Sequence, residues 1–391
     1  MKASLTDIAS IILNEFKTIA GSFAIVLVLM GGIFMYGILY NYMYAPDLVR
    51  NVPVVVVDNS KTGLSREYIR LLNATPQVDV IATGEDFPQA KELLKMNEAA
   101  GILYLPDDFT DRVSRGDESV FIMYETTDAF LYYLAMQEAS ASSMLALNAD
   151  YRPSMAVFLP AGDVAQLSAT QPINVAGTAL YNYTKGYGTY LIPAVLIVIM
   201  FQTLLMVIGM VSGDERQNRL LRYLRPSFSQ AMRLVAGKTF VYLILYAVFA
   251  FFLLGLIPFI FDLPNIGNTW NIIMLLISFL LSASFFGLAV SIFFTDSDAP
   301  LLMIAFFSVG LIFLSGVSYP LELMPWYWKL SHYLIPAAPA TLAYVKLNSM
   351  GASMSEIHTE YITLWFQCAV YFILACFAYR YNIRKSKTSN I

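Results

Sequence analysis

The sequence is poor in charge, cysteine and histidine, and each shortage excludes a class of protein. Charged residues make up 13% of its 391 residues, hydrophobic residues 58%, and mean hydropathy is +0.60. A soluble domain carries about 25% charged residues, so this composition indicates a membrane protein. Cys368 and Cys376 fall in the last apolar run, which excludes a disulfide framework. His332 and His358 have no Cys or acidic neighbour at a metal-ligand spacing, so we expect no metal site.

Motifs of enzymatic chemistry are missing as well. No G-x-S-x-G nucleophile elbow is present, and surface turns explain the acidic pairs at Asp107-Asp108 and Asp296-Ser297-Asp298. Ala236-Gly237-Lys238-Thr239 ends like a Walker A loop, but the first glycine of that motif falls on Met232. We therefore expect no catalytic residues, and no cofactor in this chain.

Charge is divided unevenly along the chain. Residues 46–185 carry 18 acidic and 10 basic side chains, a net charge of -8, which leaves +4 for the remaining residues. An acidic block beside short basic segments fits the two sides of a membrane and does not indicate nucleic-acid binding.

Long uncharged runs predict transmembrane helices. The run before Pro46 is too long for the core of a signal peptide and no A-x-A-like cleavage site follows it, so we predict a retained span at 19–45. Five more runs predict spans at 186–211, 239–261, 270–295, 299–319 and 361–379. Residues 1–18 predict an amphipathic helix lying in the inner interface, and residues 380–391 a cytoplasmic tail.

The predicted fold is therefore six transmembrane α-helices with both termini in the cytoplasm. The predicted cytoplasmic segments hold 12 basic residues, whereas the short outer loops hold only Lys329 and Lys346. This bias agrees with the positive-inside rule.

Residues 46–185 predict an inserted α/β domain outside the cytoplasm. Apolar strand-like runs alternate with helical segments, a pattern that favours a largely parallel sheet. The predicted strands are 52–58, 78–82, 99–105 and 119–125. Asn59 and Ser60 are the expected caps of the first helix.

The basic segment 212–238 connects the second and third predicted spans, within the five-helix region 186–379. It carries a net charge of +4, which places it in the cytoplasm. Leu220, Leu221 and Leu224 follow helical spacing, and Pro226 would end that helix. We interpret the segment as a short amphipathic helix that faces a soluble partner. A solvated loop that only sets the topology is the alternative.

Two further regions have polar or irregular features. Residues 320–350 combine four prolines with clustered Trp and Tyr, which indicates a re-entrant or interfacial outer segment, or else an ordinary outer loop with an aromatic belt. The predicted spans contain no charged residue, so a proton relay is disfavoured. Polar residues that could line a path, or only pack helices together, are Gln202, Thr203, Ser278, Ser282 and Ser308.

Short motifs run in a fixed order along nearly the whole chain. They are Asn14-Glu15-Phe16-Lys17, Val54–Ser60, Leu105–Phe109, Leu180–Thr184, Leu314–Val317 and Pro320–Trp326. In this order they resemble the permease subunit of type-2 ABC exporters that have a large extracytoplasmic domain after the first span. Asn14 and Tyr183 depart from that pattern, and Asn218-Arg219 replaces a Gly-Thr pair.

The resemblance implies roles for two groups of residues. The coupling residues toward an ATPase would be Glu215, Arg216, Leu220, Leu221, Arg222, Leu224, Arg225 and Pro226. An outer gate segment would include Ser315, Gly316, Pro320, Pro325, Trp326, Pro336 and Pro339.

The resemblance also implies partners and a location. A separate cytosolic ABC ATPase would supply ATP and Mg, and a second permease chain, identical or related, would complete a dimer in the bacterial cytoplasmic (inner) membrane. Membrane lipid and a periplasmic adaptor are further expected partners, and nucleic acid is not. Relatives carry varied substrates, and the uncharged spans favour an amphipathic or lipid-like one. A non-transporting receptor or scaffold that displays the outer domain is the alternative function.

Overall fold

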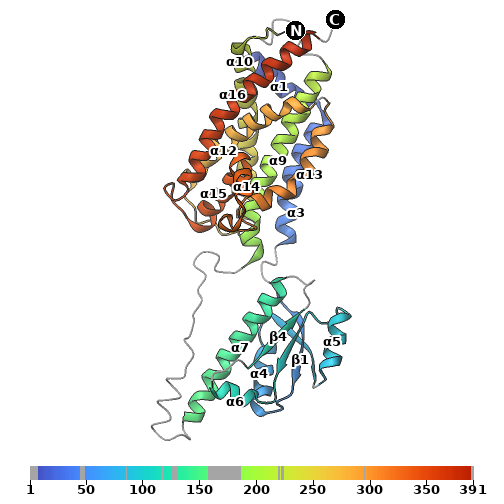
Figure 1. Ribbon diagram of the computed structural model, residues 1–391, viewed down its shortest axis with the longest axis vertical. Helices are drawn as coiled ribbons and strands as arrows, with labels where there is room; N and C mark the ends of the chain where they lie inside the picture. Colours follow the sequence, from blue (N-terminus) through green and yellow to red (C-terminus); the bar gives the residue numbers. More distant parts are fainter. Residues whose placement is uncertain are drawn as a thin grey trace. The chain divides into compact units, whose positions relative to one another are not determined.

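The computed structural model describes residues 8–44, 49–84, 86–115, 119–124, 130–156, 186–218, 221, 224–294 and 296–388. The chain forms two compact units (Figure 1). The first unit consists of Met1–Asp47 together with Ala179–Ile391, and the second unit is Leu48–Thr178.

The first unit begins with an amphipathic helix and a long apolar helix. Helix α1 (Ile8–Gly21) buries Ile11, Glu15 and Ile19 on one face, as an amphipathic helix does. Ser22 ends it and caps α2 (Phe23–Met30), since its hydroxyl accepts the amide of Ile25 at 3.5 Å. A π-helical turn η1 (Gly31–Met35) and α3 (Tyr36–Met43) continue α2, giving one apolar helix long enough to cross a membrane.

Helix α9 (Tyr187–Gln217) forms the centre of the first unit. In its most apolar window 89% of the residues are buried, well above the share in the other long helices. It packs against α12 (Thr269–Val290), α13 (Ala299–Leu314) and α15 (Ala337–Met350). Figure 1 shows α9 with α12 and α16 on one side and α3 and α13 on the other.

Two long helices complete the bundle. Helix α10 (Phe228–Ala250) continues through η3 (Phe251–Leu256) into α11 (Ile257–Ile260), and α16 (His358–Thr388) packs along α12 and α10. The sequence predicted that the third span begins at residue 239, but α10 begins eleven residues earlier. Lys238 therefore lies inside a helix of the bundle and not in a loop before it.

Among the residues that the structure describes, five helices are long and apolar enough to span a membrane: 23–43, 187–217, 228–260, 269–293 and 358–387. The expected span at 299–319 is not among them, so the predicted count of six is not confirmed. Helix α13 has 16 residues, or about 24 Å at 1.5 Å per residue, which is short of the roughly 30 Å hydrocarbon core. It ends where Gly316 adopts a positive φ of 83°.

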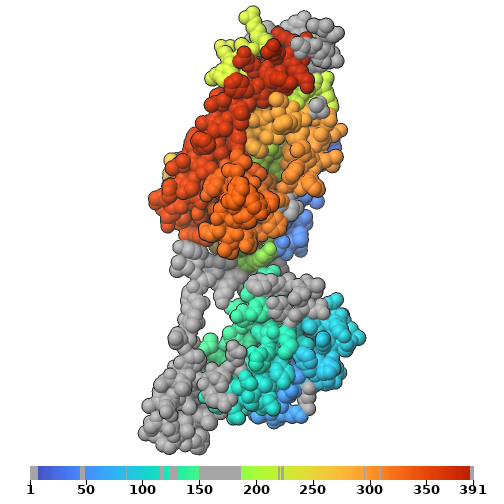
Figure 2. Space-filling model, in the orientation of Figure 1, coloured from blue at the N-terminus to red at the C-terminus, as the bar shows by residue number. Residues whose placement is uncertain are grey.

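The segment after α13 is broken into short helices by its prolines. A 3₁₀ turn η5 (Leu321–Leu323) precedes α14 (Trp326–Leu334), and α15 follows after Pro336. The Ala-rich α15 is buried against α9, whereas α14 exposes Trp326, Tyr327 and Trp328. In Figure 2 the orange surface of this region lies beside the red surface of α16.

The second unit is a four-stranded sheet covered by helices on both faces. Its strands are β1 (Val52–Asp58), β2 (Val78–Gly84), β3 (Gly101–Leu105) and β4 (Phe121–Tyr124), in the order β2-β1-β3-β4. The pairs of β1 with β2 and β3 are parallel, and β4 is antiparallel to β3. The helices are α4 (Gly63–Asn73), α5 (Phe87–Lys95), α6 (Phe109–Arg115) and α7 (Phe130–Ala156).

Each face of this sheet has its own core. Val54 and Val56 pack with α4, α6 and α7, while Val55 and Val57 pack with α5 on the other face. The first helix is capped by Thr62 in a capping box with Ser65, and not by Asn59 or Ser60 as the sequence predicted. The reason is that Ser60 and Lys61 instead donate their amides to the Asp58 carboxylate, which extends the turn.

Candidate functional site

A buried ion cluster joins three helices of the bundle. The Lys238 ammonium group on α10 donates to Glu15 Oε2 on α1 at 2.5 Å and to Glu215 Oε1 on α9 at 2.6 Å. The side chains of Lys238 and Glu15 are only 1% and 3% exposed. Because a buried charge without a partner is strongly unfavourable, this arrangement fixes the three helices to one another.

Tyrosines extend the cluster to a fourth helix. Tyr242, one turn after Lys238, donates its hydroxyl to Glu15 Oε1 at 2.5 Å. Tyr379 on α16 lies with its hydroxyl 3.3 Å from Ser212 Oγ, and its ring centre is 5.9 Å from the Lys238 nitrogen. The cluster therefore connects α1, α9, α10 and α16 at one level of the bundle.

Arg216 connects α9 to the end of α12. Its guanidinium donates to the carbonyl oxygens of Ser291 at 2.7 Å and Ile292 at 2.9 Å, and also to that of Phe294. These carbonyls belong to η4 (Ser291–Phe293) and the residue after it, at a helix C-terminus, where a cation is electrostatically favoured. Arg216 thus holds the turn between α12 and α13 against α9.

The connection between α9 and α10 is described only in part, so the predicted amphipathic helix there stays a prediction. Helix α9 ends at Gln217 and α10 begins at Phe228. Leu221 and Leu224 are buried, with 4% and 3% exposure, so they anchor the segment to the bundle and do not face solvent. Arg225 and Pro226 are exposed. Leu220 and Arg222 lie outside the described residues.

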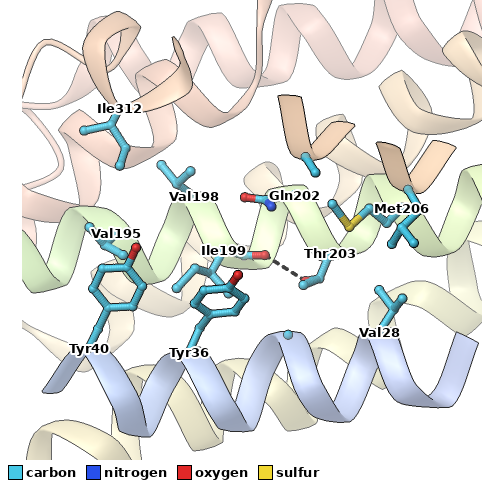
Figure 3. Close-up of a pocket in the computed structure, with 13 residues that line it drawn as sticks. Val28, Tyr36, Tyr40, Val195, Val198, Ile199, Gln202, Thr203, Met206 and Ile312 are labelled. Carbon is cyan, nitrogen blue, oxygen red and sulfur yellow. Dashed lines mark hydrogen bonds between the residues drawn. The ribbon is translucent and has the colours of Figure 1, made fainter. Parts of the chain in front are cut away.

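A hollow of about 340 Å³ opens among α2–α3, α9 and α13 (Figure 3). Tyr36 and Tyr40 rise from α3 toward α9, and Gln202 and Thr203 belong to α9. The other lining residues are Val28, Gly32, Val195, Val198, Ile199, Met206, Leu301, Ala305 and Ile312. The walls carry no charged side chain, so the hollow suits an uncharged molecule with apolar parts.

The predicted path residues separate into two groups. Gln202 and Thr203 line the hollow, but the Thr203 hydroxyl already donates to the Ile199 carbonyl at 2.8 Å. Ser278 and Ser282 are fully buried and donate to carbonyls of their own helix, which is a packing role. The side chain of Ser308 lies outside the described residues.

The predicted outer gate residues lie at the breaks between short helices. Gly316 takes a left-handed backbone, and a Cβ there would lie 2.9 Å from Leu321 Cγ. Pro325 and Pro336 are the residues before α14 and α15, and Pro339 lies in the first turn of α15. Ser315 is buried, while Pro320 and Trp326 are exposed. Tyr190 on α9 donates to the Val317 carbonyl, so this segment is attached to the central helix.

His332 fixes the end of α13 from inside this segment. The ring is fully buried, and Nδ1 donates to the Leu314 carbonyl at 2.7 Å. Burial lowers the pKa of His332, which the bond to Leu314 and the nearby charge of Glu360 partly oppose. Glu360 is itself paired with Lys346 at 2.6 Å. The neutral imidazole therefore caps a helix C-terminus at the base of the outer segment.

Residues 22–377 match the family model described as ABC-2 family transporter protein. The match covers most of the chain. The protein belongs to the ABC-2 transporter family. No curated protein matches the sequence. Together with its five long apolar helices, the family match makes this ABC-2 protein a multi-pass membrane protein, as the sequence predicted.

Sequence reasoning left several site residues of this ABC-2 protein without a role. Glu15 was part of the resemblance and Lys238 of the rejected Walker A match, but neither had an assigned partner, and Tyr36, Tyr40 and Tyr242 were not singled out. One signal could have found the pair of Glu15 and Lys238. The two residues carry opposite charges, and each lies where a polar segment meets an apolar run. Within the residues that the structure describes, no group of three His, Cys, Asp or Glu is placed to hold a metal. The motif at Leu180–Thr184 lies outside them.

Proposed function

We propose that this chain is the permease subunit of an ATP-driven ABC exporter. In this proposal two permease chains form the translocation path, and a separate cytosolic ATPase drives it. The observation that carries the proposal is the ion pair between Lys238 and Glu215, which attaches α10 to the inner end of α9 beside Arg216. Further along the same helix, Gln202 and Thr203 line the uncharged hollow.

The ATPase would contact the segment 212–238 through its exposed residues. Arg225 and Pro226 are exposed there, and they are the proposed contacts, together with Leu220 and Arg222. Leu221 and Leu224 would instead anchor the segment, while Glu215 and Arg216 would transmit its movement into the bundle. Helix α1 would move with the segment because Glu15 shares the Lys238 ammonium group.

Helix α9 would carry that movement to the hollow. Glu215 and Gln202 are 13 positions apart, which is about 20 Å along a helix at 1.5 Å per residue. ATP binding to the partner would favour one of two arrangements of the bundle, as any ligand with different affinity for two states does. The hollow would open toward opposite sides of the membrane in the two arrangements, with residues 320–350 forming the outer closure.

A second permease chain would cover the hollow from the side. Helix α13 exposes Leu302 at 74%, Phe306 at 82% and Phe307 at 58%. Two-fold pairing through this helix would bury those side chains against a second copy, and two-fold symmetry is the commonest in oligomers. The pair would then enclose a path between two such hollows.

The remaining features of the proposal concern place and substrate. The chain would lie in a bacterial inner membrane with the unit 48–178 outside the cytoplasm, where that unit could accept substrate or bind a periplasmic adaptor. The uncharged lining of the hollow favours an amphipathic or lipid-like substrate.

The proposal is tested by reconstituting the chain in lipid vesicles with the ABC ATPase that co-purifies with it. We expect ATP hydrolysis that rises when uncharged amphipathic compounds are added, and no hydrolysis from the permease chain alone. Hydrolysis by the isolated chain, or an ATPase whose rate is indifferent to every compound in a panel of lipids and drugs, would contradict the proposed role.

A further inference from the structure

A second hollow lies on different helices from the first. It is a groove of about 500 Å³ between α12–η4 and α16, and it shares no residue with the hollow of Figure 3. Its walls are Phe286, Ala289, Val290, Ile292, Phe293, Tyr371, Leu374, Phe377, Ala378 and Tyr381. None of these side chains is charged, and the α16 side is open, since Leu374, Phe377 and Tyr381 are 49–56% exposed. Figure 2 shows α16 in red at the surface.

The groove has the length of one membrane leaflet. The α16 residues that line it run from Tyr371 to Tyr381, ten positions or about 15 Å, which is half of a roughly 30 Å hydrocarbon core. Tyr371 contacts Phe286 with ring centres 5.1 Å apart, so an aromatic pair spans the groove between α16 and α12. An extended acyl chain fits a groove of this length and chemistry.

The inner end of the groove leads to two cations. At 100° per residue on α16, Lys385 lies about 15° and Arg384 about 85° from the centre line of the groove face, taken over its five α16 residues. Arg380 and Lys387 lie about 125° and 145° away from it, on other faces. All four are exposed. The charge that continues the groove is therefore positive, immediately beyond its apolar part.

We propose that this groove binds one anionic phospholipid of the inner leaflet. An acyl chain would lie between α12 and α16, and the phosphate headgroup would contact Arg384 and Lys385. This lipid site rests on the proposed function only for the choice of leaflet, because the C-terminal end of α16 is cytoplasmic in the topology proposed for the permease. A lipid held there would pack on the C-terminal end of α12 and on η4, the same end that Arg216 attaches to α9.

Native mass spectrometry of the full-length purified chain tests the site. The probes are dioleoyl phosphatidylglycerol and dioleoyl phosphatidylcholine, which share their acyl chains. We expect the anionic lipid to bind more tightly, and Arg384→Gln with Lys385→Gln to weaken it about 30-fold, since each cation near an anionic lipid contributes about 1 kcal/mol. The matched pair Arg380→Gln with Lys387→Gln removes the same charge from other faces, and should change binding less than threefold.

A third variant tests the acyl chain separately. Leu374→Trp fills the groove at an exposed position, so it should weaken binding of both lipids without unfolding the bundle. If the Arg384/Lys385 and Arg380/Lys387 variants lose the same lipid affinity, the basic tail attracts lipid without a specific site. That result would overturn the proposal. Unchanged lipid binding in Leu374→Trp would also overturn the proposal. If that variant keeps its lipid but loses a dimer, a second copy of the chain covers the groove instead of a lipid.

Discussion

Lys238 and Glu15 form a buried ion pair at 2.5 Å, although they are 223 positions apart in the sequence. Glu215 shares the same ammonium group, so one lysine balances two carboxylates in a site almost closed to solvent. The pair fastens the N-terminal helix to the bundle next to the segment that we propose as the ATPase contact.

Removal of the lysine charge should destabilise the bundle strongly. Lys238→Met leaves two buried carboxylates without their cation, and breaking a buried pair costs about 3–5 kcal/mol. Lys95→Met is the control, because Lys95 and Glu92 are 55% and 57% exposed and an exposed pair contributes about 1 kcal/mol or less. The free energy of unfolding, measured in mild detergent, distinguishes them. A loss in Lys238→Met no larger than in Lys95→Met would show that the cluster does not hold the helices together.

Gly213 should tolerate no side chain. A Cβ at this position would overlap the Asp296 carbonyl oxygen, so Gly213→Ala must push the turn after α12 away from α9. We expect a loss of about 1–3 kcal/mol from overpacking. Gly310→Ala is the matched change, because its Cβ meets nothing within 4 Å, and it should be neutral or slightly stabilising. Thermal unfolding of the two variants gives the comparison, and equal midpoints would refute the close contact.

The amide of Gln202 should matter more than the hydroxyl of its neighbour. Gln202→Leu removes a polar group from the wall of the hollow, and we expect substrate stimulation of the partner ATPase to fall about tenfold, as for the loss of one hydrogen bond of about 1.4 kcal/mol. Thr203→Val should have little effect because that hydroxyl already bonds to Ile199. If both variants stimulate like the wild type, the hollow is not the substrate site.

Stability should depend on pH through His332. Burial keeps its pKa below the ordinary value near 6.5, so the unfolded chain binds the proton more readily. The stability that the neutral ring contributes is thus complete above about pH 6.5 and declines as pH falls through that value. The charges that face it are Glu360 and Lys346. Unfolding midpoints at pH 5.5 and 7.5 should differ less in His332→Asn than in the wild type, while His358→Gln, a change at an exposed histidine, should keep the full difference.

The sequence predicted those parts of the fold that depend on local pattern. Val52–Asp58 is a strand because its apolar run is buried on both faces, and the long uncharged runs other than 299–319 form long helices. Helix ends were predicted less well. Lys238 marked the predicted start of a span, but it is accommodated inside α10 because Glu15 and Glu215 compensate its charge.

The site itself depends on contacts that no local pattern contains. The spacing of Leu221 and Leu224 was read as a face for a partner, yet both residues are buried, since hydrophobic spacing does not say which surface a face will cover. In the same way, Tyr36 and Tyr40 are ordinary aromatics of an apolar run until α3 is placed beside α9. Gln202 was found because an amide within an apolar run is unusual by itself.

The most direct test of the account is whether Arg225 controls the binding of an ATPase. Gently solubilised membranes containing the tagged full-length chain should yield a co-purifying protein with a Walker A motif, quantified by mass spectrometry. We expect Arg225→Glu to lose most of that protein, because it reverses an exposed charge at the proposed contact, and Lys387→Glu, the same reversal on the tail, to retain it. Equal capture by Arg225→Glu and the wild type would contradict the claim that this permease is driven through the segment 212–238.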